Sequence, residues 1–190
     1  MRDVVLSHLN KSFDHLAVLR DFSATFAAGR ITCIMGRSGC GKTTLLRILL
    51  GLEQADSGDI LGLPARCSAV FQENRLCDEF SAIENVRIAA PHHTAEEIKN
   101  TLSSLLLDEE AQEKPVCELS GGMRRRVAIA RALLAEGELL LMDEPFKGLD
   151  ESTRDAVIAY VKKAVAGRTV ILVTHDEEEA ALLGAPVLQM

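Results

Sequence analysis

The eight residues from Gly36 to Thr43 have the types and spacing that phosphate binding requires. They read Gly-Arg-Ser-Gly-Cys-Gly-Lys-Thr and match the pattern Gly-x-x-x-x-Gly-Lys-Ser/Thr at every position. Glycines let the backbone curl so that successive N–H groups can surround phosphate oxygens, and a helix that begins near Lys42 adds the positive end of its dipole. Lys42 brings a mobile charge to the outer phosphates, and the Thr43 hydroxyl is placed to hold magnesium. The stretch therefore predicts a phosphate-binding loop.

A second anion-binding element is expected at residues 119–122, which read Leu-Ser-Gly-Gly. Ser120 supplies a hydroxyl, and Gly121 and Gly122 supply bare backbone amides at the predicted start of a helix, where anions bind favourably. A phosphate group held by the first loop does not need a second anion-binding element, which we call the second cradle, in the same chain.

Polar side chains follow three buried stretches of the chain. Asp143 follows an apolar run and can deliver a carboxylate to a metal ion, while Glu144 suits a general base that deprotonates an attacking water. Gln72 can reach metal or water with its amide oxygen, and His175 can hydrogen-bond a terminal phosphate. Because ligand sites of open α/β sheets lie at the carboxyl ends of the strands, we expect these groups to converge on the phosphate loop.

The elements that must position these groups are read from hydrophobic periodicity. An antiparallel β ribbon is expected from residues 4–13 and 22–26, and a mostly parallel α/β core follows. Two capping boxes, at Ser81 and Thr94, indicate helices inserted between strands. We predict one domain over 1–190, with a core of 1–72 and 136–190 and a helical subdomain over about 73–135. Strands are predicted at 31–35, 60–63, 67–71, 138–142 and 169–173, and helices at 42–50, 120–134 and 151–166.

Composition limits the class of protein. The formal net charge of −7 leaves no sequence-wide basic field for nucleic acid, and no apolar stretch has the roughly 18 residues of a membrane span. Five scattered cysteines favour a reducing compartment over disulfides or structural zinc. The arginines at 124–126 fan around a predicted helix, so we expect them on a solvated surface. The sequence thus predicts a cytosolic globular protein.

Taken in order, the motifs resemble those of the ATP-binding subunits of ABC transporters, and they cover nearly the whole chain. The resemblance implies a P-loop NTPase fold, ATP and Mg²⁺ as cofactors, and ATP hydrolysis. It implies that the nucleotide contacts Phe13, Val18, Gly36, Ser38, Gly39, Cys40, Gly41, Lys42, Thr43, Thr44 and Gln72. Phe13 stands where the family more often has Tyr and would stack on adenine.

The resemblance also assigns roles in hydrolysis. Thr43, Gln72 and Asp143 would surround magnesium, Glu144 would be the catalytic base and His175 the switch histidine, with Lys42 and Gln72 completing the catalytic set. The γ-phosphate of an opposite subunit would bind Ser120, Gly121 and Gly122, with Asp150 lining the shared interface. Two chains would therefore pair head to tail, as a homodimer or heterodimer with ATP between them.

The surroundings of the motifs look like those of nitrate, sulfonate and taurine importer ATPases, on residues 38–47 and 70–76. Met123 departs from the usual Gln, Phe146 and Lys147 replace commoner small residues, and the chain ends at Met190 without the usual tail. The resemblance implies transmembrane permease subunits as partners, an extracytoplasmic solute-binding protein in importers, and a peripheral place on the cytoplasmic face of the membrane.

Two other functions stay open at this stage. A soluble ABC ATPase could act on nucleic acid or a protein complex, but the chain has one cassette and no coiled-coil insert between Gln72 and Ser120. An adaptor without hydrolysis is disfavoured because Glu144 and His175 are both present.

Overall fold

A five-stranded parallel sheet forms the centre of the computed structural model, which describes residues 2–190. Across the sheet the strands follow the order β5 (Cys67–Val70), β6 (Leu139–Asp143), β7 (Thr169–Val173), β3 (Ile31–Met35) and β8 (Val187–Gln189). Both β6 and β7 are buried at every residue. Their side chains alternate between two cores, so the sheet is covered on both faces, as parallel sheets are.

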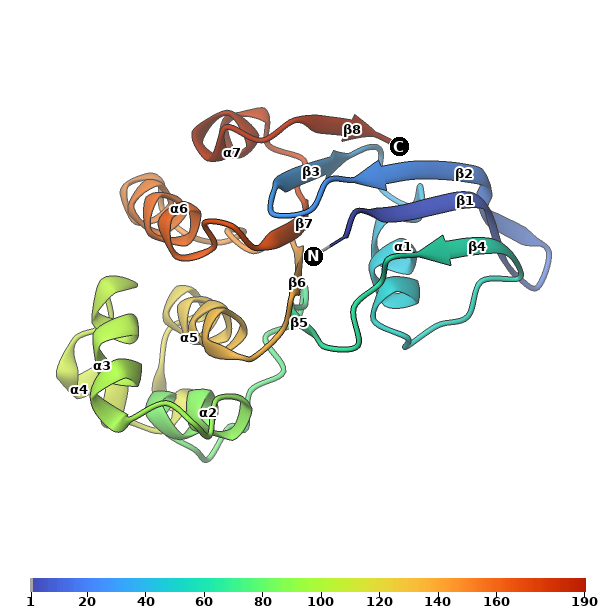
Figure 1. Ribbon diagram of the computed structural model, residues 1–190. Coiled ribbons are helices and arrows are strands. Elements are labelled where there is room, and N and C mark those ends of the chain that lie inside the picture. Colours follow the sequence, from blue (N-terminus) through green and yellow to red (C-terminus); the bar gives the residue numbers. More distant parts are fainter. Residues whose placement is uncertain (1) are drawn as a thin grey trace.

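An antiparallel sheet and one helix cover the first face (Figure 1). The sheet has the order β2 (Leu16–Phe26), β1 (Val4–Phe13) and β4 (Ser57–Leu61), and α1 (Lys42–Leu49) packs between it and the parallel sheet. The predicted antiparallel ribbon is confirmed, with β4 as a third strand. The strand predicted at 60–63 is misplaced, because β4 begins three residues earlier and ends at Leu61.

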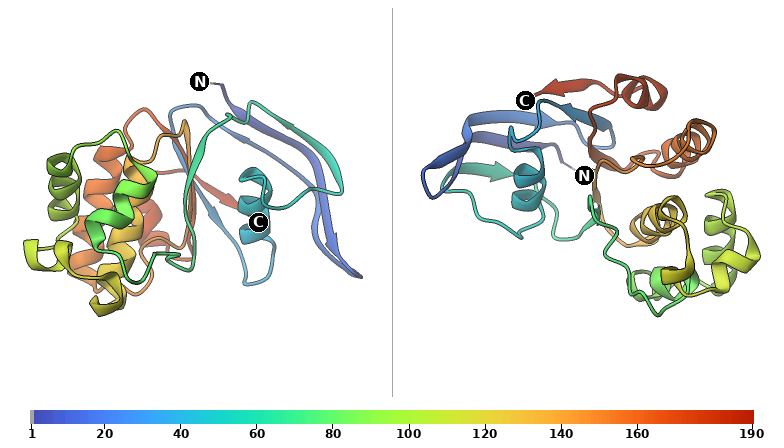
Figure 2. Two further views of the ribbon diagram at one scale, coloured as in Figure 1. Left: turned by 90° about the horizontal axis from the view of Figure 1, so that it is seen from below. Right: turned by 180° about the vertical axis from the view of Figure 1, so that it is seen from behind.

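Helices cover the other face (Figures 1 and 2). They are α5 (Gly121–Leu134), α6 (Glu151–Ala164) and α7 (Glu177–Leu183), and beyond α5 lie α2 (Ala82–Ala89), α3 (Ala95–Ser104), α4 (Glu109–Glu113) and a 3₁₀ turn, η1 (Val116–Glu118). Both predicted capping boxes are present, with Ser81 and Thr94 as the N-caps of α2 and α3. The limits of a separate helical subdomain at 73 and 135 stay a prediction.

The parallel arrangement brings four connecting segments to one edge of the sheet. The segments that follow β3, β5, β6 and β7 all leave from the carboxyl ends of neighbouring strands. They carry the glycine-rich loop, Gln72, Glu144 and His175, respectively. The edge where they meet is where an α/β sheet binds its ligand.

Candidate functional site

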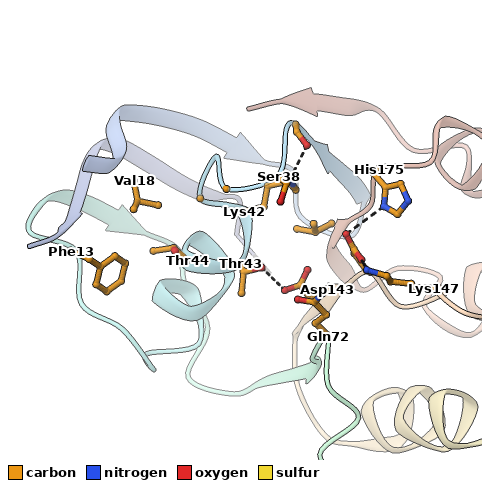
Figure 3. Close-up of a pocket in the computed structure, with 15 residues that line it drawn as sticks. Phe13, Val18, Ser38, Lys42, Thr43, Thr44, Gln72, Asp143, Lys147 and His175 are labelled. Atoms are coloured by element: carbon orange, nitrogen blue, oxygen red, sulfur yellow. Dashed lines mark hydrogen bonds and ion pairs between the residues drawn. The ribbon is translucent and has the colours of Figure 1, made fainter. Parts of the chain in front are cut away.

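A pocket of about 520 Å³ lies at this edge of the sheet (Figure 3). The predicted site residues that line it come from both sheets and the loops between them: Phe13, Val18, Gly36, Ser38, Gly39, Gly41, Lys42, Thr43, Thr44, Gln72, Asp143, Glu144 and His175. Lys147 and Val173 also line it. Among the predicted contacts, Cys40 does not line the pocket, although its Sγ lies 3.7 Å from Lys42 Nζ.

The glycine-rich loop makes a tight turn in front of α1. Gly41 has φ 102°, and a Cβ there would lie 2.9 Å from the Val18 oxygen, so only glycine fits. Since Gly41 is also the N-cap, no side chain occupies the first N–H groups of α1. Lys42 Nζ donates to the carbonyls of Gly36 (2.8 Å) and Arg37 (3.0 Å). The loop thus combines free amides with a cation that can turn to a phosphate.

Thr43 and Asp143 come together at the inner wall of the pocket. The Thr43 hydroxyl donates to Asp143 Oδ2 over 2.8 Å, and Asp143 is buried. Burial raises the pKa of Asp143, and the Thr43 hydrogen bond opposes that rise. With Gln72 in the same pocket, these side chains offer only oxygen ligands, which Mg²⁺ prefers. Among residues 2–190 no cluster of three or more His, Cys, Asp or Glu side chains could hold a metal ion.

Glu144 leaves β6 in a left-handed backbone conformation, with φ 46°. A non-glycine residue in this region is strained, and such strain is common where a side chain is held for function. Glu144 forms ion pairs with Lys147 Nζ (2.8 Å) and His175 Nδ1 (3.4 Å). Burial alone would raise the pKa of Glu144, but Lys147 and His175 together hold it below its ordinary value. Glu144 is therefore ionised near neutral pH and can accept a proton.

Phe13 forms the far wall of the pocket at the end of β1. Its ring is 43% exposed, and Lys11 Nζ lies 5.0 Å from the ring centroid. Lys11 is anchored in turn by Glu53, at 2.9 Å. Phe13 thus presents a supported aromatic face on which a planar group can stack.

The Leu-Ser-Gly-Gly segment lies outside this pocket. Ser120 caps α5 by accepting a hydrogen bond from the Met123 N–H (3.2 Å), and Gly121 is exposed with open space where a Cβ would stand. Asp150 caps α6 by accepting from the Thr153 N–H (3.0 Å). One copy of the chain therefore presents the second cradle on its surface, away from its own phosphate loop.

Two charged residues have places that the sequence analysis missed. Arg125 is 4% exposed, so the solvated surface predicted for residues 124–126 is wrong at this position. The two neighbouring arginines have other partners. Arg124 forms an ion pair with Asp78, and Arg126 donates hydrogen bonds to the backbone oxygens of Leu105 and Leu106. Lys147, noted only as a departure, contacts Glu144 inside the pocket. A basic residue three positions after a candidate carboxylate of the site is a signal that could have shown this pair.

Comparisons with known proteins identify the family of the chain. A profile described as ABC transporter matches residues 19–147. An aliphatic sulfonates import ATP-binding protein of Agrobacterium fabrum is 41% identical over 95% of this chain and 73% of its own length. A taurine import ATP-binding protein of Roseobacter denitrificans is 39% identical over 93% of this chain and 71% of its own length.

Solved structures show the same fold. A dimeric bacterial ABC transporter cassette superposes with a TM-score of 0.87 and 25% identity over 98% of this chain and 94% of its own. A second structure, of a cassette bound to ADP and Pi after hydrolysis, has a TM-score of 0.83 and 27% identity over the same shares. The chain belongs to the ABC transporter family and is an ATPase of that family.

Proposed function

We propose that this chain is the ATP-hydrolysing subunit of an importer and drives a separate membrane permease for a small solute. The observation that supports this most is its 39–41% identity, over more than nine-tenths of the chain, to sulfonate and taurine import ATP-binding proteins. The pocket is lined by Lys42, Gln72, Asp143, Glu144 and His175, the groups to which we assign roles in hydrolysis, and this disfavours an adaptor without activity.

In this proposal adenine stacks on Phe13, and the phosphates lie in the amide cradle with Lys42 at their outer end. Thr43, Gln72 and Asp143 hold magnesium, which neutralises phosphate charge when bound. Glu144 accepts a proton from the attacking water, and His175 beside it orients the terminal phosphate. Lys147 keeps Glu144 ionised until nucleotide is present.

Hydrolysis takes place between two copies paired head to tail. The support is the exposed position of Ser120 and Gly121, together with the dimeric form of the related cassette. Each copy closes the phosphate pocket of the other with this second cradle, and Asp150 lies in the same interface.

The permease binds the segment from Gln72 to Ala90. This segment begins at the pocket, passes Phe80, which is 44% exposed, and continues into α2, where Ile88 is 58% exposed. Because Gln72 lines the pocket that would hold the terminal phosphate, a nucleotide change there would move the docking segment. The chain would then sit on the cytoplasmic face of the membrane, with an extracytoplasmic binding protein delivering the solute. Among residues 2–190, no helix has both the length and the apolar character needed to cross a membrane.

Photo-cross-linking tests this function in membranes that hold the chain and its permease. A photoreactive amino acid at Ile88 should give an adduct with an integral membrane protein. The matched control is Leu61, which is 63% exposed on β4 of the antiparallel sheet and should give none. Adducts with soluble proteins or nucleic acid at Ile88, and none with a membrane protein, would instead favour an ABC ATPase outside transport.

A further inference from the structure

The Arg125 side chain extends from α5 into the junction between β5 and β6, and the proposed mechanism does not use it. All six hydrogen-bond acceptors of its guanidinium are neutral. They are the backbone oxygens of Phe71, Gln72, Asp143, Glu144 and Pro145, and the side-chain oxygen of Asn74. Burial without a bonded carboxylate lowers the pKa of Arg125, although Asp143 and Glu144 oppose the shift at longer range.

These acceptors belong to two segments that bring side chains to the ATP pocket. Nη1 donates to Gln72 O over 3.2 Å, and Nη2 donates to Glu144 O over 2.5 Å. The guanidinium is planar and its nitrogens have fixed spacing, so one rigid group sets the distance between the two backbones. The Gln72 and Glu144 side chains face the pocket, and their positions relative to each other therefore depend on this distance between the two backbones.

The same residue lies on the helix that presents the second cradle. Arg125 is five residues after Ser120, the N-cap of α5. A shift of α5 along its axis therefore moves the donors that hold Gln72 and Glu144. The Arg125 side chain thus connects three structural elements of the proposed site: the segment after β5, the end of β6, and the helix that would face the partner copy.

We propose that Arg125 is a positioning residue for ATP hydrolysis, which sets Gln72 relative to Glu144 and couples both to the helix that begins after Ser120. This inference rests on the roles proposed above for Gln72 and Glu144. Arg125 contacts the backbone behind these two side chains and does not line the pocket. Binding of ATP by the phosphate loop should therefore not depend on Arg125, but the alignment of the attacking water with the phosphate should depend on it.

The test compares two substitutions of Arg125 with one of Arg168. Arg168 is a matched control because it too is largely desolvated and donates to Leu133 O and Ser68 Oγ, far from the pocket. For the full chain with Mg-ATP, Arg125→Gln should lower kcat at least ten-fold with KM changed less than three-fold. Arg125→Lys should recover part of kcat, since an ammonium offers only three donors at one point. Arg168→Gln should lower the melting temperature and leave kcat near the original.

Several results would overturn the positioning role. One is a folded Arg125→Gln variant with kcat within two-fold of the original. Another is an Arg168→Gln variant that loses as much kcat as Arg125→Gln when the two variants have lost the same amount of melting temperature. If Arg125→Gln does not fold, Arg125→Lys decides by the same criterion. Glu144→Gln separates the two proposals, because unchanged turnover there would reject the base itself, whatever Arg125 does.

Discussion

Replacing Glu144 by glutamine removes the proposed proton acceptor while it keeps the shape of the side chain. In the structure the carboxylate pairs with His175 and Lys147, whose side chains are 67% and 56% exposed. Both partners stay solvated in the variant, and exposed ion pairs contribute about 0–1 kcal/mol. The free energy of unfolding should therefore change by less than about 1 kcal/mol.

Turnover should change far more than stability. Loss of a general base lowers kcat by about 10²–10⁴-fold, which corresponds to roughly 3–5 kcal/mol in the barrier. ATP then persists between the phosphate loop of one copy and Ser120 to Gly122 of the other. Because single copies bind ATP too, each ATP stabilises the pair only by its extra affinity for the closed site, and a 100-fold higher affinity corresponds to about 2.7 kcal/mol. Two sites together raise the dimer association constant by roughly ten-thousand-fold.

Light scattering of the purified Glu144→Gln chain at high concentration measures this effect. We expect dimers with Mg-ATP and monomers with ADP. The control adds Gly121→Trp, because a Cβ at Gly121 meets no atom within 4 Å and the backbone there is unstrained. This double variant should fold and bind ATP, yet remain monomeric. A Glu144→Gln chain that retains ATP but stays monomeric would refute the shared site in the isolated protein.

Three further outcomes are expected. Lys42→Ala should abolish tight Mg-ATP binding in calorimetry without unfolding the chain, because the hydrogen bonds of Lys42 Nζ to Gly36, Arg37 and Cys40 lie within its own loop. Hydrogen bonds from Thr153 lower the pKa of Asp150 from 3.8 to about 2, so its contribution to stability is complete above pH 4 and disappears as the pH falls towards 2. Urea unfolding of Asp150→Asn should lack that part of the pH dependence. Asn85→Ala should lower the free energy of unfolding by about 1–3 kcal/mol, because the buried Asn85 amide serves backbone groups of Cys77 and Phe80.

The strands show where sequence patterns are sufficient and where they are not. β3 and β7 begin and end at the predicted residues, because a strand covered on both faces is a mostly apolar run between polar or glycine residues. β4 was misplaced because Ser57 and Gly58 are typical turn residues. Its strand conformation comes from antiparallel pairing with β1, in which Ser57 lies opposite Asn10. Such pairing depends on residues far apart in the chain, so a local pattern does not show it.

The residues that line the pocket were easier to predict from the sequence than the residues that hold them in place. Apart from Phe13 and Val18, which belong to the antiparallel sheet, the lining residues named from the sequence lie at or shortly after the carboxyl ends of parallel strands, where the edge rule brings them together. Lys147 was not assigned to the pocket, although its spacing from Glu144 was a signal, because its contact with the carboxylate depends on the loop conformation. The Phe146 ring, another departure from the family pattern, is a core residue with 1% exposure.

Arg125 shows how residue type and position conflict. As part of an arginine triplet it has the type of a surface residue, yet it shares one helical face with Ala128, Ile129 and Ala132, all buried. Position decides the outcome, since that face packs against the sheet. A guanidinium is tolerated there because the strand ends offer enough carbonyl groups to occupy its donors. A charged residue on the apolar face of a helix that starts at a binding motif is therefore a sequence signal for a group that positions the site from behind.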